Sequence, residues 1–179
     1  MRTVSYAVNP ETSLTEIRRN DKATFLEYLV EKEIYDFTLA IPHPYKEEDA
    51  EEWIRINEQR LEEESPVTTF AIRRGEKLLG CCGFLPAGGP MKHTSEIGYW
   101  LGKPHWGQGI MSQVVGKLCE IGFNDLGLFR ITAHIFSHNS RSERVLLNNR
   151  FRQEGVLRSH YLKDGAYRDA KIFARLKTD

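Results

Sequence analysis

The alternation of apolar and polar positions predicts a chain of short strands and amphipathic helices. In the first half, it predicts a strand over 14–18 and a helix after Asp21, a residue type that favours helix N-caps. A longer amphipathic helix should follow, with one face that carries Ala50, Trp53, Ile54, Asn57 and Leu61. Strands over 67–73 and 77–85 flank the turn Arg74-Gly75-Glu76, a pattern typical of a β-hairpin.

The second half predicts one strand–helix–strand crossover and then a final hairpin. The expected elements are a strand over 95–101, a helix over about 107–127, a strand over 130–136, a short helix over 140–149 and two strands over 154–161 and 167–175. Strands outnumber helices in this pattern. We therefore expect an α+β fold, with a mixed, mostly antiparallel, twisted sheet of about six or seven strands and helices on both faces, in a single domain over residues 1–179.

Composition narrows the class of protein. The 25 Lys and Arg residues balance 25 Asp and Glu residues, so no net field favours nucleic acid or an anionic membrane as a partner. No apolar run approaches the ~18–20 residues that span a bilayer, and the first residues lack an apolar signal segment, so we expect a cytoplasmic protein. Cys81, Cys82 and Cys119 show no zinc-like spacing with histidine, which predicts buried free thiols and no metal site.

The stretch with the most specific chemistry runs from Ser95 to Ser112 and combines a strand, a loop with two glycines and a helix start. A helix N-terminus offers unpaired N–H groups and a partial positive charge, both of which favour a phosphate. Gly107 and Gly109 would let an anion approach the backbone, although a tight turn without a ligand explains them equally well. Nucleotide fingerprints fit less well, because Ile110 stands in place of a lysine and Ser112 in place of a third glycine.

The same stretch resembles the acyl-CoA-binding motif of the GNAT acetyltransferase superfamily, whose loop reads Gln/Arg-x-x-Gly-x-Gly/Ala. Trp106 and Met111 depart from that motif, and such departures are familiar in the RimJ/RimL group of ribosomal-protein N-terminal acetyltransferases. Further segments that resemble this group are 44–45, 53–54, 96–101, 139–151 and 167–176. The likeness covers nearly the whole chain, and the group usually has glycine where Arg150 stands.

The resemblance implies a binding site for coenzyme A. In that family the strand before the loop pairs its backbone groups with the pantetheine amides, a role that falls here on Tyr99, Trp100 and Leu101. The backbone N–H groups that would hold the pyrophosphate are those of Trp106, Gly107, Gln108, Gly109, Ile110 and Met111. Ser112 either adds a hydroxyl bond to this group or simply lies in the first helical turn.

Asn139 and Ser142 open the short helix and have two compatible interpretations. From the residues alone, Asn139 or Ser140 is a good N-cap, and Ser140 with Glu143 fits a capping box. The resemblance to the family implies that Asn139 contacts the pantetheine arm. It also implies that Ser142 lies near the thioester sulfur, where its hydroxyl can protonate the leaving thiolate.

The group that takes the proton from the amine is left open by the sequence. His160 is chemically suited, since an imidazole titrates near neutrality, whereas the RimL-like pattern commonly has an acidic residue at that position. Glu96 is the rival base, although a structural carboxylate within the sheet explains it as well. Positioning the amine beside the thioester can supply much of the rate without any named base.

These observations predict an acetyl-CoA-dependent N-acetyltransferase in which a primary amine attacks the thioester directly. The expected acceptor is a protein N-terminus or a small-molecule amine, and the expected state is a monomer or a homodimer. The alternative is a non-catalytic CoA or acyl-CoA sensor. A nucleotide-binding protein is the third hypothesis.

Overall fold

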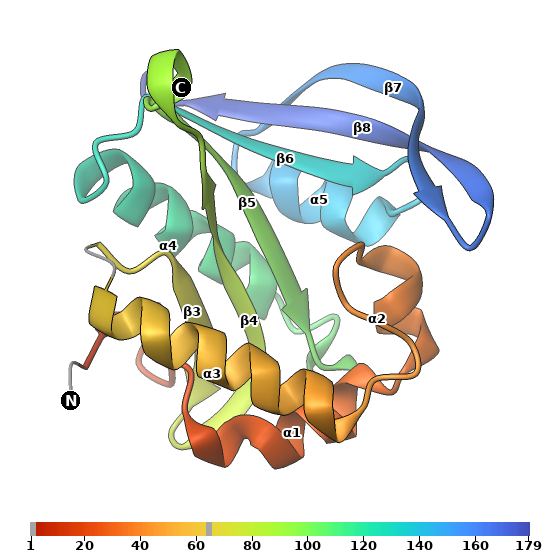
Figure 1. Cartoon of the computed structure of the whole chain (residues 1–179). Helices are drawn as coiled ribbons and strands as arrows, with labels where there is room; N and C mark the ends of the chain where they lie inside the picture. Colours follow the sequence, from red (N-terminus) through yellow and green to blue (C-terminus); the bar gives the residue numbers. More distant parts are fainter. Residues whose placement is uncertain (1–2, 64–65) are drawn as a thin grey trace. The chain divides into compact units, whose positions relative to one another are not determined.

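The structure, a computed structural model, describes residues 3–63 and 66–179 (Figure 1). Within these residues the chain forms five α-helices and eight β-strands. It folds as two compact units: an N-terminal unit of Met1–Gly83 with Tyr99–Ile110, and a C-terminal unit of Phe84–Gly98 with Met111–Asp179. The single domain expected from the sequence stays a prediction.

The N-terminal unit contains four antiparallel strands in the order β1-β2-β3-β4. Its strands are β1 (Ser5–Ala7), β2 (Thr12–Thr15), β3 (Thr69–Arg74) and β4 (Lys77–Pro86), the last residues of which pass into the other unit. Its helices are α1 (Lys22–Leu29), α2 (Lys32–Phe37) and α3 (Glu47–Glu63). The predicted hairpin is confirmed as β3 and β4. The first predicted strand lies two to three residues earlier, and β1 and α2 were not predicted.

The helix α3 packs through the face that the sequence predicts. Its buried residues are Ala50, Ile54, Asn57 and Leu61. Ala50 and Ile54 belong to one apolar cluster with residues of α1, β3 and β4, and Trp53 packs against the edge of this cluster. Figure 1 shows α3 crossing in front of β3 and β4, and its contacts with the apolar cluster bury this face.

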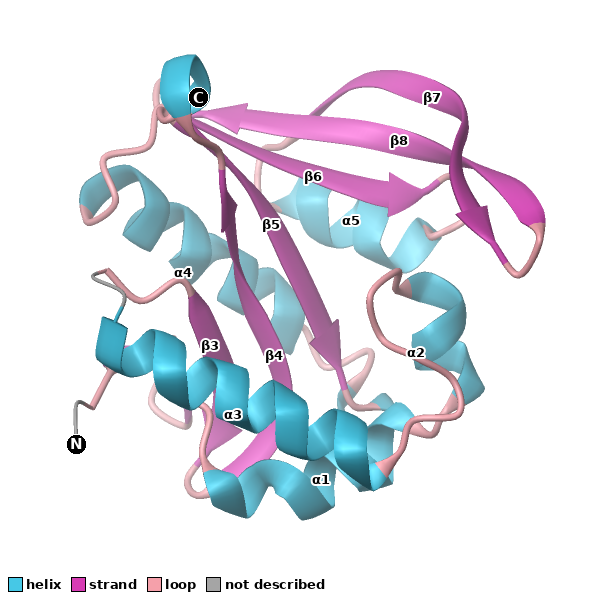
Figure 2. Cartoon of the chain, viewed as in Figure 1, coloured by secondary structure: helices cyan, strands magenta, loops and turns pink. Residues whose placement is uncertain are grey.

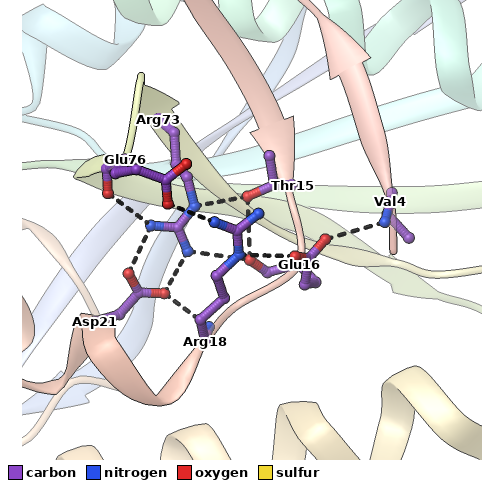
Figure 3. A network of polar contacts seen from close by, with 7 residues as sticks. All are labelled: Val4, Thr15, Glu16, Arg18, Asp21, Arg73 and Glu76. Carbon is purple, nitrogen blue, oxygen red and sulfur yellow. Dashed lines mark hydrogen bonds and ion pairs between the residues drawn. The ribbon is translucent and has the colours of Figure 1, made fainter. Parts of the chain in front are cut away.

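Asp21 does not cap α1, which corrects the prediction for this residue. Its side chain makes no capping hydrogen bond to α1. Instead, both terminal nitrogens of Arg73 donate to its carboxylate, each over 2.6 Å, and the backbone N–H of Arg18 donates to it over 2.7 Å (Figure 3). Asp21 and Arg73 are both buried, and Nε of Arg73 also donates to Oγ1 of Thr15. A buried charge requires such a partner, and here it is a residue on β3.

The C-terminal unit contains the strands in the order β5-β6-β8-β7. Its elements are β5 (Thr94–Leu101), which ends in the other unit, α4 (Ile110–Asn124), β6 (Arg130–Phe136), α5 (Ser140–Asn148), β7 (Arg152–Lys163) and β8 (Ala166–Leu176). β5 pairs with β6 in parallel, whereas β6 with β8 and β7 with β8 pair antiparallel. The mixed, mostly antiparallel α+β fold is therefore confirmed, with eight strands in the described residues rather than six or seven.

Alternation along β6 separates a buried face from a half-buried one. Ile131, Ala133 and Ile135 are buried, whereas Thr132 and His134 are only partly buried. A Cβ added to Gly122 of α4 would lie 2.7 Å from Cδ1 of Ile131, so α4 packs closely against the buried face. The other face of β6 carries the polar side chains.

The edge strand β7 contains a wide bulge. Leu157 pairs with Ala170 and Tyr161 pairs with Arg168, so residues 158–160 stand opposite Asp169 alone. The backbone N–H of Ser159, which has a φ of 50°, donates to Oδ1 of Asp169 over 2.7 Å. Figure 2 shows the sharp turn of β7 along its length. Bulges of this kind re-aim a side chain, and this one carries His160.

The buried thiols agree with the sequence prediction. Cys81, Cys82 and Cys119 are free and buried, and burial raises the pKa of the Cys119 thiol to about 11. These thiols are therefore protonated and unreactive at neutral pH.

Across residues 3–63 and 66–179, no helix is both long enough and apolar enough to cross a bilayer.

We expect Arg150→Gly to stabilise the protein by about 0.5–1 kcal/mol, because a left-handed residue with a Cβ costs roughly 1–2 kcal/mol, partly offset by the entropy of glycine. Arg150 has a φ of 61°, and its N–H donates to the carbonyl of Leu147 at the end of α5. Urea denaturation would measure the gain. Arg150→Ala is the control, since it removes the contact of the guanidinium with the carbonyl of Asp179 and keeps the Cβ. A glycine variant no more stable than the alanine variant would contradict the strain.

Candidate active site

The two-glycine loop has the conformation that a turn into a helix requires. Gly107 and Gly109 both have a φ of +74°, and α4 begins at Ile110. A Cβ at either glycine would meet no atom within 4 Å, so the backbone conformation, and not packing, requires glycine here. Gly107, Gln108 and Gly109 are exposed. The loop therefore offers accessible backbone at the start of a long helix, where a phosphate is favoured.

Buried side chains of the N-terminal unit hold the residues just before this loop. Nε2 of His105 lies 3.1 Å from the hydroxyl of Tyr28, and burial lowers the pKa of this histidine. The indole N–H of Trp106 donates to the carbonyl of Leu101 over 2.7 Å. The side chains of His105 and Trp106 thus have structural roles, and any role of Trp106 toward a ligand falls on its backbone.

The end of β5 is fixed by close packing within the same unit. The ring of Trp100 lies 6.0 Å from that of Phe25, and Leu101 is buried. A Cβ added to Gly80 of β4 would lie 2.2 Å from the carbonyl oxygen of Trp100, so the two backbones approach as closely as glycine allows. The backbone of Tyr99, Trp100 and Leu101 is therefore set by its neighbours.

Asn139 is the N-cap of α5, which confirms one of the two interpretations of this residue. Its side-chain oxygen accepts a hydrogen bond from the backbone N–H of Ser142 over 3.1 Å, and it is 7% exposed. Ser112, in the first turn of α4, accepts a hydrogen bond at its carbonyl from Nδ2 of Asn149 over 2.9 Å. The start of α4 and the end of α5 are thereby joined within the C-terminal unit.

The C-terminal unit brings Glu96 and His160 together around a third residue, His134. Oε2 of Glu96 lies 3.0 Å from Nδ1 of His134, and the rings of His134 and His160 stack with centroids 5.8 Å apart and planes 17° apart. His134 was not singled out from the sequence. Its alternate position on the strand 130–136, next to the strand that carries Glu96, is the signal that could have found it.

Tyr161 flanks this group and stays neutral. Its ring lies 4.6 Å from that of His160 and 5.4 Å from that of Phe136. Burial, together with the charge of Glu96, raises the pKa of Tyr161 to about 12. The phenol therefore keeps its proton at neutral pH and adds no charge beside the two histidines.

The predicted residues fall into two sets. Tyr99, Trp100, Leu101 and the loop 106–110 lie in the N-terminal unit, whereas Glu96, Met111, Ser112, Asn139, Ser142 and His160 lie in the C-terminal unit. The N-terminal unit thus carries most of the two-glycine loop, and the C-terminal unit carries the contact between Glu96 and His134.

Comparison with known proteins identifies the class. Residues 12–152 match the model of the acetyltransferase (GNAT) domain, and the chain belongs to this family of N-acetyltransferases. It is 34% identical over 124 residues to an uncharacterized N-acetyltransferase, p20, of Bacillus licheniformis, covering 69% of each chain. It is 32% identical over 130 residues to the ribosomal-protein-serine acetyltransferase of Escherichia coli K12, covering 73% of this chain and 72% of that one.

Solved structures share the fold at low sequence identity. RimL, a ribosomal L7/L12 α-N-protein acetyltransferase in complex with coenzyme A, matches with a TM-score of 0.84 and 20% identity, over 97% of this chain and 98% of that one. The ribosomal-protein-S5-alanine acetyltransferase of Vibrio fischeri matches with a TM-score of 0.82 and 21% identity, over 98% of both chains. The GNAT-like fold expected from the sequence is confirmed.

Proposed function

We propose that this protein transfers the acetyl group of acetyl-CoA to a primary amine. The observation that carries the proposal is the two-glycine loop, which has positive φ at Gly107 and Gly109 and leads into α4 in a chain of the GNAT family. Acetyl-CoA supplies an activated acetyl group and a pyrophosphate that suits such a helix start. The residues proposed to hold the pyrophosphate through backbone N–H groups are those of 106–111, with the hydroxyl of Ser112 beside them.

The remaining cofactor contacts are assigned from the resemblance to the family. The backbone of Tyr99, Trp100 and Leu101 would form hydrogen bonds with the pantetheine amides, in the way that an edge strand pairs with an added strand. Asn139 would contact the pantetheine arm. Its side-chain oxygen already caps α5, so its amide N–H₂ group is the part suited to a ligand.

The chemistry needs a neutral amine and a protonated leaving group. As the C–N bond forms and the C–S bond breaks, the hydroxyl of Ser142 is placed by this proposal to protonate the thiolate. Glu96 and His160 are the two candidates that the sequence offers for the group that takes the amine proton. Correct positioning of the amine beside the thioester would supply a further large part of the rate.

We propose a protein N-terminus as the acceptor. The support for this acceptor is the similarity to the ribosomal-protein-serine acetyltransferase of Escherichia coli K12, which is 32% identical over 130 residues. A small-molecule amine is the alternative, and a sensor that binds CoA without turnover is the rival to any enzymatic role.

Acetyl-CoA at a hundred times its Kd should stabilise the protein by about 2.7 kcal/mol, which corresponds to a rise in Tm of roughly 5–10 °C. Thermal unfolding with acetyl-CoA, NAD and ATP would measure this, and we expect a rise with acetyl-CoA alone. Thiol release with peptides that begin with serine or alanine, and with a panel of small amines, would then identify the acceptor. No rise with acetyl-CoA would refute the proposal, and a rise without thiol release for any amine would favour the sensor.

A further inference from the structure

We propose that His134 takes the proton from the attacking amine, that Glu96 positions the ring of His134, and that the ring of His160 stacks over it. This inference rests on the proposed acetyl transfer and names the base for it. It replaces two separate candidate bases by one assembly, all of whose members lie in the C-terminal unit.

Strand register places the pair on one face of the sheet. Glu96 of β5 pairs with Thr132 of β6 in parallel, so Glu96 and Thr132 point to the same side. His134 lies two residues further along β6 and points to that side as well. The side chain of His134 is 18% exposed and that of Glu96 is 34% exposed, so the pair is shielded from bulk water and still reachable.

The contact with Glu96 orients the ring of His134 for proton uptake. Oε2 of Glu96 faces Nδ1 of His134 at 3.0 Å, which leaves Nε2 of the ring for a substrate proton. Uptake of that proton at Nε2 would leave Nδ1 facing the carboxylate of Glu96, so the ring keeps its orientation during the step. Tyr161, whose pKa is raised to about 12, remains neutral and adds no charge beside the ring.

His160 is less suited to be the base, although it lies close by. It is exposed and stands on the bulge of an edge strand, whereas His134 is half-buried and pairs with Ile172 of β8 in a regular stretch of β6. Its ring lies flat over that of His134, with planes 17° apart. Asp169 fixes the bulge through the N–H of Ser159 and so holds this ring in place. His160 therefore covers His134 on one side and limits the access of water.

The step balances without any further reactant. The amine nitrogen forms a bond to the carbonyl carbon of the thioester, and the C–S bond breaks with its electron pair going to sulfur. The amine proton goes to Nε2 of His134, and the sulfur receives a proton from the hydroxyl of Ser142. The products are the acetamide and the free thiol, after which His134 releases its proton to solvent and Ser142 regains one from solvent.

His134→Gln should lower kcat by about 10²–10⁴-fold, the usual contribution of a general base. The measurement is steady-state acetylation, by the wild type and each variant, of the amine that the wild type acetylates fastest, with KM for acetyl-CoA and the acetyl-CoA thermal shift recorded in parallel. We expect KM and the thermal shift to change little. His93→Gln is the matched control, since His93 is also a histidine of the C-terminal unit, is exposed and lies outside this group.

The pH profile separates a base from a structural residue. For the wild type, kcat/KM should fall on the acid side as the base becomes protonated, and His134→Gln should lose this limb. Glu96→Gln keeps the imidazole but removes the carboxylate that faces Nδ1, so it should lower kcat less than His134→Gln and retain the acid limb. Added imidazole should restore part of the activity of His134→Ala and none to His93→Gln.

Two results would overturn the inference. One is a His134→Gln enzyme that binds acetyl-CoA and keeps kcat within about threefold of the wild type. The other is a His134→Gln enzyme whose acid limb is the same as that of the wild type. A wild type that binds acetyl-CoA but acetylates no amine would instead overturn the proposed function, and this inference with it, so the two failures are distinguishable.

Discussion

Replacing Asp21 by alanine should lower the free energy of unfolding by roughly 3–5 kcal/mol, the usual cost of leaving one member of a buried ion pair without its partner. Arg73 is 2% exposed and Asp21 is 3% exposed, so water cannot replace the lost carboxylate. The substitution would also remove the acceptor of the backbone N–H of Arg18 (Figure 3). No other interaction in the N-terminal unit combines such burial with a full charge on each side, within the described residues.

Urea denaturation of Asp21→Ala would measure this loss, and we expect Tm to fall by about 10 °C. Glu76→Ala is the matched control from the same network. Its carboxylate is 91% exposed and pairs with Arg18, so its loss should cost at most about 1 kcal/mol. A double variant, Asp21→Leu with Arg73→Met, should recover much of the stability because neither charge remains buried. Equal losses for Asp21→Ala and Glu76→Ala would contradict this account.

Gly80→Ala should both destabilise the protein and weaken the binding of acetyl-CoA. The added Cβ would lie 2.2 Å from the carbonyl oxygen of Trp100 and 2.8 Å from the Cα of Leu101, so β5 must move. Overpacking of this kind costs about 1–3 kcal/mol. Because Tyr99, Trp100 and Leu101 are proposed to bind pantetheine through their backbone, we expect the affinity to fall about tenfold, equivalent to roughly one hydrogen bond.

Denaturation and acetyl-CoA titration of Gly80→Ala would test both effects. Gly155→Ala is the control, since its Cβ would meet only a methyl group of Ile172, at an ordinary distance of 3.7 Å. We expect the control to change neither quantity appreciably. If Gly80→Ala lost stability but kept its affinity for acetyl-CoA, the role assigned to the end of β5 would be wrong.

Most of the fold was predictable because its elements have strong local patterns. The strand over 130–136 is β6 with the same bounds, and the turn Asp164-Gly165 joins β7 to β8 with a positive φ at both residues. β1 and α2 were missed since they are short, with three and six residues, and show little periodicity. β1 exists because it pairs with β2, which a local pattern cannot reveal.

Site residues were predictable only where a residue type has one dominant structural role that local sequence reveals. Glycine at positive φ and asparagine as an N-cap are such cases, and both were found at the expected positions. Asp21 was misassigned because its partner, Arg73, is distant in the sequence, and capping was the only use visible locally. His134 was missed for the same reason, since its contacts are with Glu96 and His160 on other strands.

The bulge of β7 lies in the outermost strand of its unit, where a change of length disturbs no further pairing. Residues can be added or removed between Leu157 and Tyr161 while the register on both sides is kept. Such changes would replace the side chain that covers His134 without altering Glu96 or His134 themselves. Under the proposed mechanism, this short segment can vary in evolution or in engineering while Glu96 and His134 keep their places on β5 and β6.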